Sequence, residues 1–319
     1  MRRIPLLFSD HKLGLPLPAT SPLHHDESGN GYALRMAVAN GIPFSELAGL
    51  VASPGHRYMP AKAAPILAYL FGGSLVEIQR AIPEHRVSNG KTRVAFMGHT
   101  LNRSYLVRHT WPQVCPACLY ECGYAKALWD LAMSVACEIH RVVLVDRCNV
   151  CGRRLSWRRP SLNTCWCGHT LSELPGIVAG HDAYMWSLQL ARLFVAEVVH
   201  GRSDVFGFLN GLDLDMRQRL VRACGLSALY EGKSVQPGTL VRQRSSAEMF
   251  HVVVLGLQRC GRLMEGAAKE ELVGDDLYEA ADAALVALLN SRFGLKQRGR
   301  GRKEIAYVQL EFQLHQGGD

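Results

Sequence analysis

The sequence contains no hydrophobic run long enough to cross a membrane. Apolar stretches such as residues 250–257 are far shorter than the roughly 18 residues that a spanning helix needs. The apolar residues 4–8 are followed at once by the polar residues 9–12, so they are too short for the hydrophobic region of a secretory signal. We therefore expect a cytoplasmic protein without a membrane partner, whose thiols stay reduced.

Sequence signatures of catalysis are also missing. The chain has no GxxxxGK[ST] phosphate-binding loop, no HExxH zinc-protease motif and no evident pair or triad of carboxylates for acid–base or nuclease chemistry. Charged residues make up 20% of the chain and hydrophobic residues 48%, a balance that fills cores and is unlike that of a disordered protein. For 319 residues we predict two or three modest folded domains and no enzymatic activity, which argues against a zinc-supported nuclease.

The excess of positive charge favours an anionic partner such as DNA, though only mildly, because 36 lysines and arginines stand against 28 acidic residues. Two basic clusters stand out, Arg158 with Arg159 beside Trp157, and a glycine-interrupted stretch over residues 296–303. The cations of that stretch are Lys296, Arg298, Arg300, Arg302 and Lys303. We predict that both clusters contact nucleic acid, with a salt-sensitive affinity and little sequence preference. A solvated face for the first cluster and a flexible loop for the second are the open alternatives.

Cysteine usage is the most informative feature. Eight of the ten cysteines lie between residues 115 and 167, and seven of these form, with one histidine, four closely spaced pairs. The pairs are Cys115 with Cys118, Cys137 with His140, Cys148 with Cys151, and Cys165 with Cys167. Eight such ligands are the complement of two tetrahedral zinc sites, because each short turn lets both of its ligands face one ion.

The simplest pairing of these ligands is sequential, so that the first two pairs form one site and the last two pairs the other. A cross-braced pairing, in which the first and third pairs share an ion, stays open. Complete four-ligand shells leave no position for a substrate, so both zinc ions are expected to be structural, each supplying about 10 kcal/mol of apparent binding energy to folding. Cys122 is interpreted as a core thiol or a spare ligand, and His169 as a surface histidine or one that supports the ligands from behind.

The remaining pattern predicts a mainly α fold with small zinc-ribbon or zinc-finger β elements. Residues 1–30, rich in proline and histidine, are expected to form an extended arm. A helical domain is predicted over residues 31–110, a double zinc-binding domain over 111–175, and a helical C-terminal domain over 176–319.

Several elements can be placed within these domains. Short helices are expected over residues 32–40, 43–51, 64–71 and 74–80. Gly72-Gly73 separates the last two, and Ser74 with Glu77 has the form of a capping box. Helix, glycine turn and capped helix suggest a helix-turn-helix, with an ordinary helical hairpin as the alternative.

Further elements are less regular. A strand is expected over residues 93–97, and a helix over 121–136 that bridges the first knuckle to Cys137. Apolar residues recur at helical spacing in two later stretches, which predicts two core-facing helices. These residues are Trp186, Leu190, Leu193, Phe194 and Val198, and then Leu277, Ala281, Ala284, Leu285 and Leu288.

The spacing of the zinc ligands and the residues around them resembles the zinc region of TniQ/TnsD proteins, in a short TniQ form. The matching residues are Cys115-Pro-Ala-Cys118-Leu119, Glu121, Tyr124, Lys126, Trp129, Cys137-x-x-His140, Leu144, Cys148-x-x-Cys151-Gly152 and Cys165-x-Cys167-Gly168. Glu27-Ser28, Leu34-Arg35, Asn40 and the helical pair around Gly72-Gly73-Ser74 resemble the opening of the same family. The resemblance spans roughly residues 20–175. Asn149 stands where the family usually has proline.

The resemblance implies a transposition targeting adaptor with no chemistry of its own. Such proteins connect a target-recognition factor, in some systems an RNA-guided CRISPR effector, to an AAA+ ATPase that recruits a DDE transposase. The chain is short compared with family members that read a fixed DNA site, so the resemblance leaves open whether it reads DNA itself. A homodimer is possible. A zinc-containing helix-turn-helix transcriptional regulator is the alternative, and neighbouring transposase and ATPase genes would separate the two.

Overall fold

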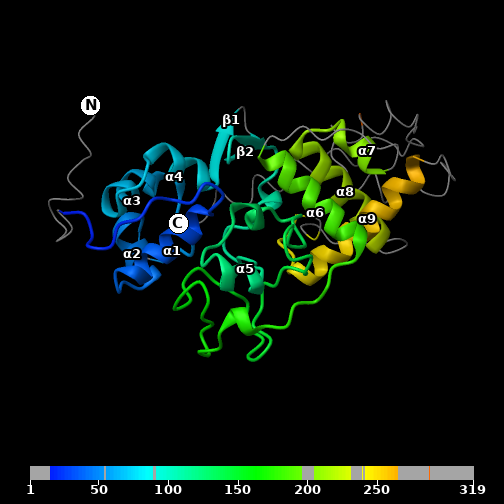
Figure 1. Ribbon diagram of the computed structural model, residues 1–319. Coiled ribbons are helices and arrows are strands. Elements are labelled where there is room, and N and C mark those ends of the chain that lie inside the picture. Colours follow the sequence, from blue (N-terminus) through cyan, green and yellow to red (C-terminus); the bar gives the residue numbers. More distant parts are fainter. Residues whose placement is uncertain are drawn as a thin grey trace.

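The computed structural model describes residues 15–53, 55–88, 91–195, 205–230, 239, 241–264 and 287. These residues form a mainly helical protein, as the sequence predicts, with one small sheet that lies ahead of the cysteine region. In place of the predicted zinc-ribbon strands, the described cysteine region has isolated β-bridges. Helices α1–α4 lie on one side, helices α6–α9 on the other, and the short helix α5 lies between them (Figure 1). None of the described helices is both long and apolar enough to cross a membrane. Outside the described residues lie Val198, the basic stretch over 296–303 and the five residues of the second predicted stripe, Leu277, Ala281, Ala284, Leu285 and Leu288.

The N-terminal helices begin and end close to the caps and turns that the sequence predicts. They are α1 (Gly29–Ala39), α2 (Phe44–Val51), the 3-10 turn η1 (Ala61–Ala63), α3 (Ala64–Phe71) and α4 (Leu75–Ala81). Asn40 caps the end of α1 as expected. Gly72 ends α3 with a left-handed φ of 71°, which costs glycine little, and the Ser74 hydroxyl accepts the Glu77 amide to start α4. Helix, turn and capped helix are therefore present as predicted.

Helix α1 begins three residues earlier than the pattern indicates. Ser28 is its N-cap, and its hydroxyl accepts the Gly31 amide at 3.3 Å. The two glycines of the first turn are buried because neighbours lie very close: a Cβ on Gly29 would be 2.4 Å from Ile82. These glycines serve close packing inside a helix, whereas the sequence placed Gly29 in the extended arm predicted over residues 1–30.

A three-stranded antiparallel sheet follows, built from β1 (Glu84–Ser88), β2 (Lys91–Phe96) and β3 (His99–Leu101) in that order. Strand β2 corresponds to the strand expected over residues 93–97, while β1 and β3 were not anticipated. Buried Val94 and Phe96 of β2 point into the core. The 3-10 turn η2 (Ser104–Leu106) then leads into the cysteine region.

The helix expected over residues 121–136 is wrong. Helix α5 (Pro116–Glu121) ends before this range, and only the 3-10 turn η3 (Ala127–Asp130) falls within it. Beyond the short local bonds of η3, the backbone here bonds to distant segments, since Ala127 donates to Asp26 and Ala132 to Leu106, both at 2.7 Å. Apolar spacing suggested a helix, but the segment is a buried, largely extended strap.

The C-terminal part consists of α6 (His181–Phe194), α7 (Val205–Asn210), α8 (Leu214–Leu229) and α9 (Ser246–Met264), preceded by the 3-10 turn η4 (Leu171–Glu173). Trp186, Leu190 and Phe194 are buried on α6, which confirms the predicted stripe there. Helices α8 and α9 touch backbone to backbone, because a Cβ on Gly225 would meet the Val252 carbonyl oxygen at 1.9 Å and one on Gly256 that of Val221 at 2.1 Å.

One hydrophobic core runs through the N-terminal helices, the cysteine region and the C-terminal helices. The extended residues 15–28 also pack against the protein, since Leu17 and Ser21 donate their amides to carbonyls at the end of α3. Glu27 and Ser28 are fully buried. The cysteine region is therefore the middle of the molecule, and its correct folding bears on both flanking parts.

Candidate metal centres

The first cluster joins two segments that the strap keeps together. Cys115 is the N-cap of α5 and Cys118 lies in its first turn, while Cys137 and His140 follow the strap. The three cysteines are buried, and all four ligand atoms lie within 4.8 Å of one another. Pro116 at the first helical position stabilises the turn between the two sulfurs, because it needs no backbone hydrogen bond there.

Distances within this cluster suit a zinc ion. Tetrahedral zinc with Zn–S near 2.3 Å and Zn–N near 2.05 Å implies S···S separations of about 3.8 Å and S···N separations of about 3.6 Å. Cys118 Sγ lies 3.5 Å from Cys137 Sγ, and His140 Nδ1 lies 3.6 Å from Cys115 Sγ and from Cys137 Sγ. The fourth contact, Cys118 Sγ to His140 Nδ1, is shorter at 3.2 Å. The donor set of three thiols and an imidazole therefore fits zinc.

The far nitrogen of the histidine has its own partner. His140 Nε2 lies 2.9 Å from the Glu121 carboxylate, which projects from the end of α5. If the Nδ1 atom carries the metal, Nε2 holds the proton and donates to Glu121, an arrangement that fixes the tautomer and the ring orientation. Glu121 follows Cys118 by three residues, so helical spacing could have indicated this role in the sequence.

Electrostatics in the first cluster also call for a cation. Hydrogen bonds with Cys118 and Cys137 lower the pKa of the Cys115 thiol to about 4. The same kind of contact, from Cys115 and Cys137 together with burial, raises the pKa of Cys118 far above its ordinary value. One thiolate forms readily and a second beside it does not, unless a divalent cation shares the cluster and stabilises all of them.

The second cluster is made by two loops with little secondary structure. Cys148 and Cys165 are buried, whereas Cys151 and Cys167 are exposed. Cys148 Sγ lies 3.8 Å from Cys167 Sγ, and Cys151 Sγ lies 3.6 Å from Cys165 Sγ, again close to tetrahedral values. Burial raises the pKa of Cys165 to about 12, so this thiol would ionise at neutral pH only with a metal beside it.

Each ligand turn of the second cluster closes in the same way. The residue after the second cysteine of each pair is a glycine with positive φ, 68° at Gly152 and 84° at Gly168. The Gly152 amide donates to the Cys148 carbonyl and the Gly168 amide to the Cys165 carbonyl, both at 2.9 Å. Positive φ is inexpensive for glycine, which explains why this residue follows both pairs.

The structure decides the pairing that the sequence left open. The clusters are sequential, with Cys115, Cys118, Cys137 and His140 in one and Cys148, Cys151, Cys165 and Cys167 in the other, so the cross-braced alternative is wrong. Cys122 belongs to neither cluster and is exposed, so it is not a core thiol. His169 is also outside both clusters. Each cluster can hold one zinc ion with four protein ligands, which would leave no open coordination position.

The arginine pair predicted to contact nucleic acid is used inside the protein. Arg159 is 1% exposed, and its guanidinium donates to the Leu162 and Ser156 carbonyls. Burial lowers its pKa to about 9. Arg158 is half-buried and donates twice to the His56 carbonyl. Arg159 therefore has no surface from which to reach a phosphate, because packing beside Trp157 takes up the whole side chain.

Buried polar contacts that the sequence does not reveal fasten the metal region to its surroundings. Arg108 forms a buried ion pair with Asp146 at 2.8 Å and donates to the Arg244 carbonyl ahead of α9. Ser28 donates to the buried Asp130 at 2.6 Å, across 102 positions of sequence. Pairings over such separations leave no local pattern, so only the folded chain brings them together.

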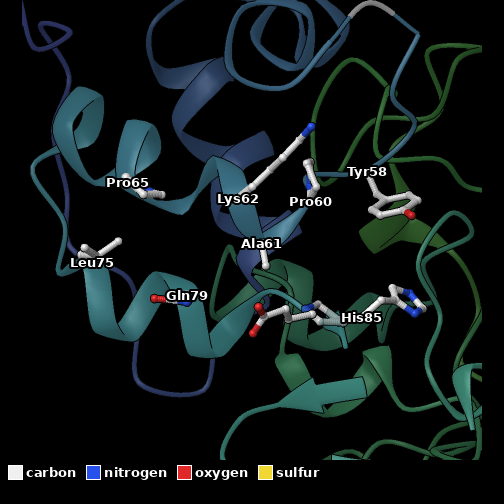
Figure 2. Close-up of a pocket in the computed structure, with 10 residues that line it drawn as sticks. Tyr58, Pro60, Ala61, Lys62, Pro65, Leu75, Gln79 and His85 are labelled. Carbon is white, nitrogen blue, oxygen red and sulfur yellow. The ribbon is translucent and has the colours of Figure 1, made fainter. Parts of the chain in front are cut away.

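A groove opens on the N-terminal side between η1, α4 and the start of β1, with a volume of about 390 Å³. Figure 2 shows Leu75 and Gln79 on one wall and Pro60 and Ala61 on another, with His85 at the end. The full lining is Tyr58, Pro60, Ala61, Lys62, Pro65, Leu75, Gln79, Pro83, Glu84 and His85. Three prolines, Ala61 and Leu75 make much of this lining apolar, as is common in binding pockets.

Comparison with known proteins agrees with this geometry. Residues 18–144 match the family model TniQ, a range that contains helices α1–α5, the sheet and all four residues of the first metal cluster. No curated protein matches the sequence. The TniQ domain gives the chain a role associated with transposition. Residues 18–144 therefore carry a TniQ domain.

Proposed function

We propose that this protein is a transposition targeting adaptor, a cytoplasmic binding module that connects a target-recognition factor to an AAA+ regulator and so to the transposase. The observation that carries the proposal is the TniQ domain over residues 18–144, which contains a cluster of four candidate ligands that would complete a tetrahedral zinc shell. A closed shell cannot polarise a substrate, so the function must reside on surfaces that the metal region holds in place.

The metal region suits a role as a central clamp. With zinc bound, Cys115, Cys118, Cys137 and His140 would fix both ends of the buried strap, and the second cluster would order two loops that have little secondary structure. Structural zinc supplies folding energy that such loops cannot obtain from packing alone. Two partners could then bind to rigid surfaces on opposite sides of the clamp.

We place the AAA+ regulator at the exposed face of α4. Val76 is 67% exposed and Leu75, which also lines the groove, is 44% exposed. Arg80 is the only cation on this short helix. Exposed aliphatic side chains next to a proline-lined groove favour a protein partner, whereas a helix that reads the major groove carries polar and basic side chains. This surface supports the adaptor over the alternative of a helix-turn-helix transcriptional regulator.

A binding experiment with purified components tests the proposal. The zinc-loaded protein and the AAA+ ATPase encoded by the same mobile element are combined with ATP, and complex formation is measured by size-exclusion chromatography and by ATPase rate. We expect a complex that Val76→Asp weakens at least tenfold. Val241→Asp is the matched control, because Val241 is 48% exposed and lies far along the chain ahead of α9.

Two outcomes would count against the adaptor. Absence of any complex with the ATPase, while the protein is folded and zinc-loaded, removes its central claim. Tight, sequence-specific binding of a short DNA duplex that Arg80→Ala abolishes would favour the transcriptional regulator. Loss of the complex in Val76→Asp and Val241→Asp alike would retain the adaptor but reject α4 as the binding surface.

A further inference from the structure

The loops of the second metal cluster present an aromatic and an aliphatic side chain to solvent. Trp166, between Cys165 and Cys167, is 49% exposed, and Val150, just before Cys151, is 64% exposed. The sulfur atoms across the cluster lie 3.6 and 3.8 Å apart, so the two loops lie against each other. We call Arg147, Val150, Arg153 and Trp166 the ribbon tip.

The ribbon tip is positively charged without compensation. Residues 147–172 contain five arginines and no aspartate or glutamate. Arg147 and Arg153 are exposed, and neither forms an ion pair with a carboxylate among the described residues. The nearest acid in sequence, Asp146, is 4% exposed and is already paired with Arg108 and Arg154. Exposed guanidinium groups without a carboxylate partner favour an anionic ligand.

The arginines are also placed in relation to the metal loops. Arg147 donates to the Gly152 carbonyl at 3.2 Å, which holds its guanidinium against the first loop. The Arg153 carbonyl accepts the Cys148 amide, so its backbone is part of the same turn. Positive charge and an exposed indole therefore lie on the two adjoining loops of one metal cluster.

We propose that the ribbon tip binds single-stranded nucleic acid, with a base stacked on Trp166 and the adjoining phosphates bound by Arg147 and Arg153. An indole ring stacks on any base, and guanidinium groups pair with phosphate oxygens. A base offers its face for stacking only when it is unpaired, so the tip should prefer single strands to duplexes. An acidic protein would use the charge but has no equal need for the exposed ring.

This surface does not depend on the proposed adaptor role, because it is assigned from the second cluster and requires no ATPase. It also differs from the predicted contacts at Arg158 and Arg159, whose side chains are turned to backbone carbonyls. Single-stranded RNA and single-stranded DNA both offer unpaired bases and phosphates, so both are used as probes.

The tryptophans of the chain provide a selective reporter. Of the five, Trp129, Trp157 and Trp186 are at most 1% exposed, and Trp111 is half-buried. Quenching of the intrinsic fluorescence by a stacked base would therefore report mainly on Trp166. Zinc-loaded full-length protein is titrated with oligo(dT) and oligo(U) of equal length, with fluorescently labelled strands and anisotropy giving the affinity.

We expect quenching together with a measurable affinity at low salt. Stacking contributes about 1–3 kcal/mol per base, so Trp166→Ala should weaken binding by roughly 5- to 150-fold while Trp166→Phe retains most of it. Arg147→Gln and Arg153→Gln should each reduce the salt slope, by about 0.7 for each phosphate that the protein no longer neutralises. Tyr120→Ala is the control, since Tyr120 is an 82% exposed aromatic beside the first cluster.

Each variant must hold two zinc ions per chain before its binding is compared, which separates a weakened binding surface from a misfolded protein. Equal affinity of Trp166→Ala and the unmodified protein overturns the stacking role. A duplex of the same length that binds as tightly as the single strands, or no binding to either probe at low salt, overturns the ligand assignment. Stronger binding of oligo(U) than oligo(dT) identifies RNA as the source of the strand, and the reverse identifies DNA.

Discussion

Replacing Gly256 by alanine tests the crossing of the two longest described helices. A Cβ at this position would lie 2.1 Å from the Val221 carbonyl oxygen and 3.0 Å from its carbonyl carbon. Ordinary contact begins near 3.4 Å, so α8 and α9 would have to separate by about 1 Å at this point. The obstacle is backbone within a helix, which cannot turn away as a side chain could.

The sign of the effect follows from two opposed terms. Removing glycine from a helix interior returns about 1 kcal/mol, whereas overpacking of a core costs about 1–3 kcal/mol and occasionally more. Moving the two helices apart would also open the contact between Gly225 of α8 and the Val252 backbone of α9. That contact is equally close, because a Cβ on Gly225 would be 1.9 Å from the Val252 carbonyl oxygen. We expect a net loss of about 2 kcal/mol or more in the free energy of unfolding.

The assay is urea unfolding of the zinc-loaded protein, followed by far-ultraviolet circular dichroism. Gly261→Ala is the matched control on the same helix, because a Cβ there meets nothing within 4 Å. That substitution should raise stability by up to about 1 kcal/mol. If Gly256→Ala is as stable as the original, or if both substitutions shift stability in the same direction, the close approach of the helices is incorrect.

Three further predictions concern the metal region. Glu121→Gln should lower zinc affinity at the first cluster by about 10- to 100-fold in a chelator competition, because it weakens the partner of His140; an unchanged affinity would remove the orienting role. Cys148→Ser should reduce the zinc content from two ions per chain to one and disorder the surrounding loops, whereas Cys122→Ser should leave it at two; elemental analysis of the purified proteins decides between these results. Burial raises the pKa of Asp130 to about 7 from 3.8, so in this pH range the folded protein holds a proton that the unfolded chain has lost. The free energy of unfolding should therefore fall by about 2 kcal/mol as the pH rises from about 5.5 to 7.5. Asp130→Asn should flatten that slope in zinc-saturated protein, and a slope equal to that of the unmodified chain contradicts the assignment.

Local features of the chain could be predicted because their physics is local. The ligand turns depend on two residues at short spacing, and the ends of α1 and α3 depend on an asparagine cap and a left-handed glycine. The Ser74 cap of α4 is likewise a contact between near neighbours. A single sequence contains all the information that such contacts need.

Misleading signals arose where distant segments control the backbone. The residues after Glu121 have apolar side chains at helical spacing, yet their backbone groups bond to residues 26–28 and 106–108 and the chain stays extended. Gly29 falls in the predicted extended arm, but it begins α1, and it and Gly31 admit Ile82 and Ala125 into close contact. Arg159 looks like a surface cation, and three bonds to backbone carbonyls hold it in the core.

By itself the sequence predicted which residues can bind metal and that each ion would have four protein ligands, because ligand type and spacing set both expectations. Tertiary structure alone decided which pairs share an ion, since sequential and cross-braced arrangements use the same ligands and differ only in how the loops meet. It also decided that the metal region is the centre of one continuous core, and that its outward face carries Trp166 together with Arg147 and Arg153, which pair with no carboxylate in the part of the chain that the structure describes. Burial and charge pairing are properties of the folded surface, and contacts across a hundred residues or more, such as Ser28 with Asp130, create that surface.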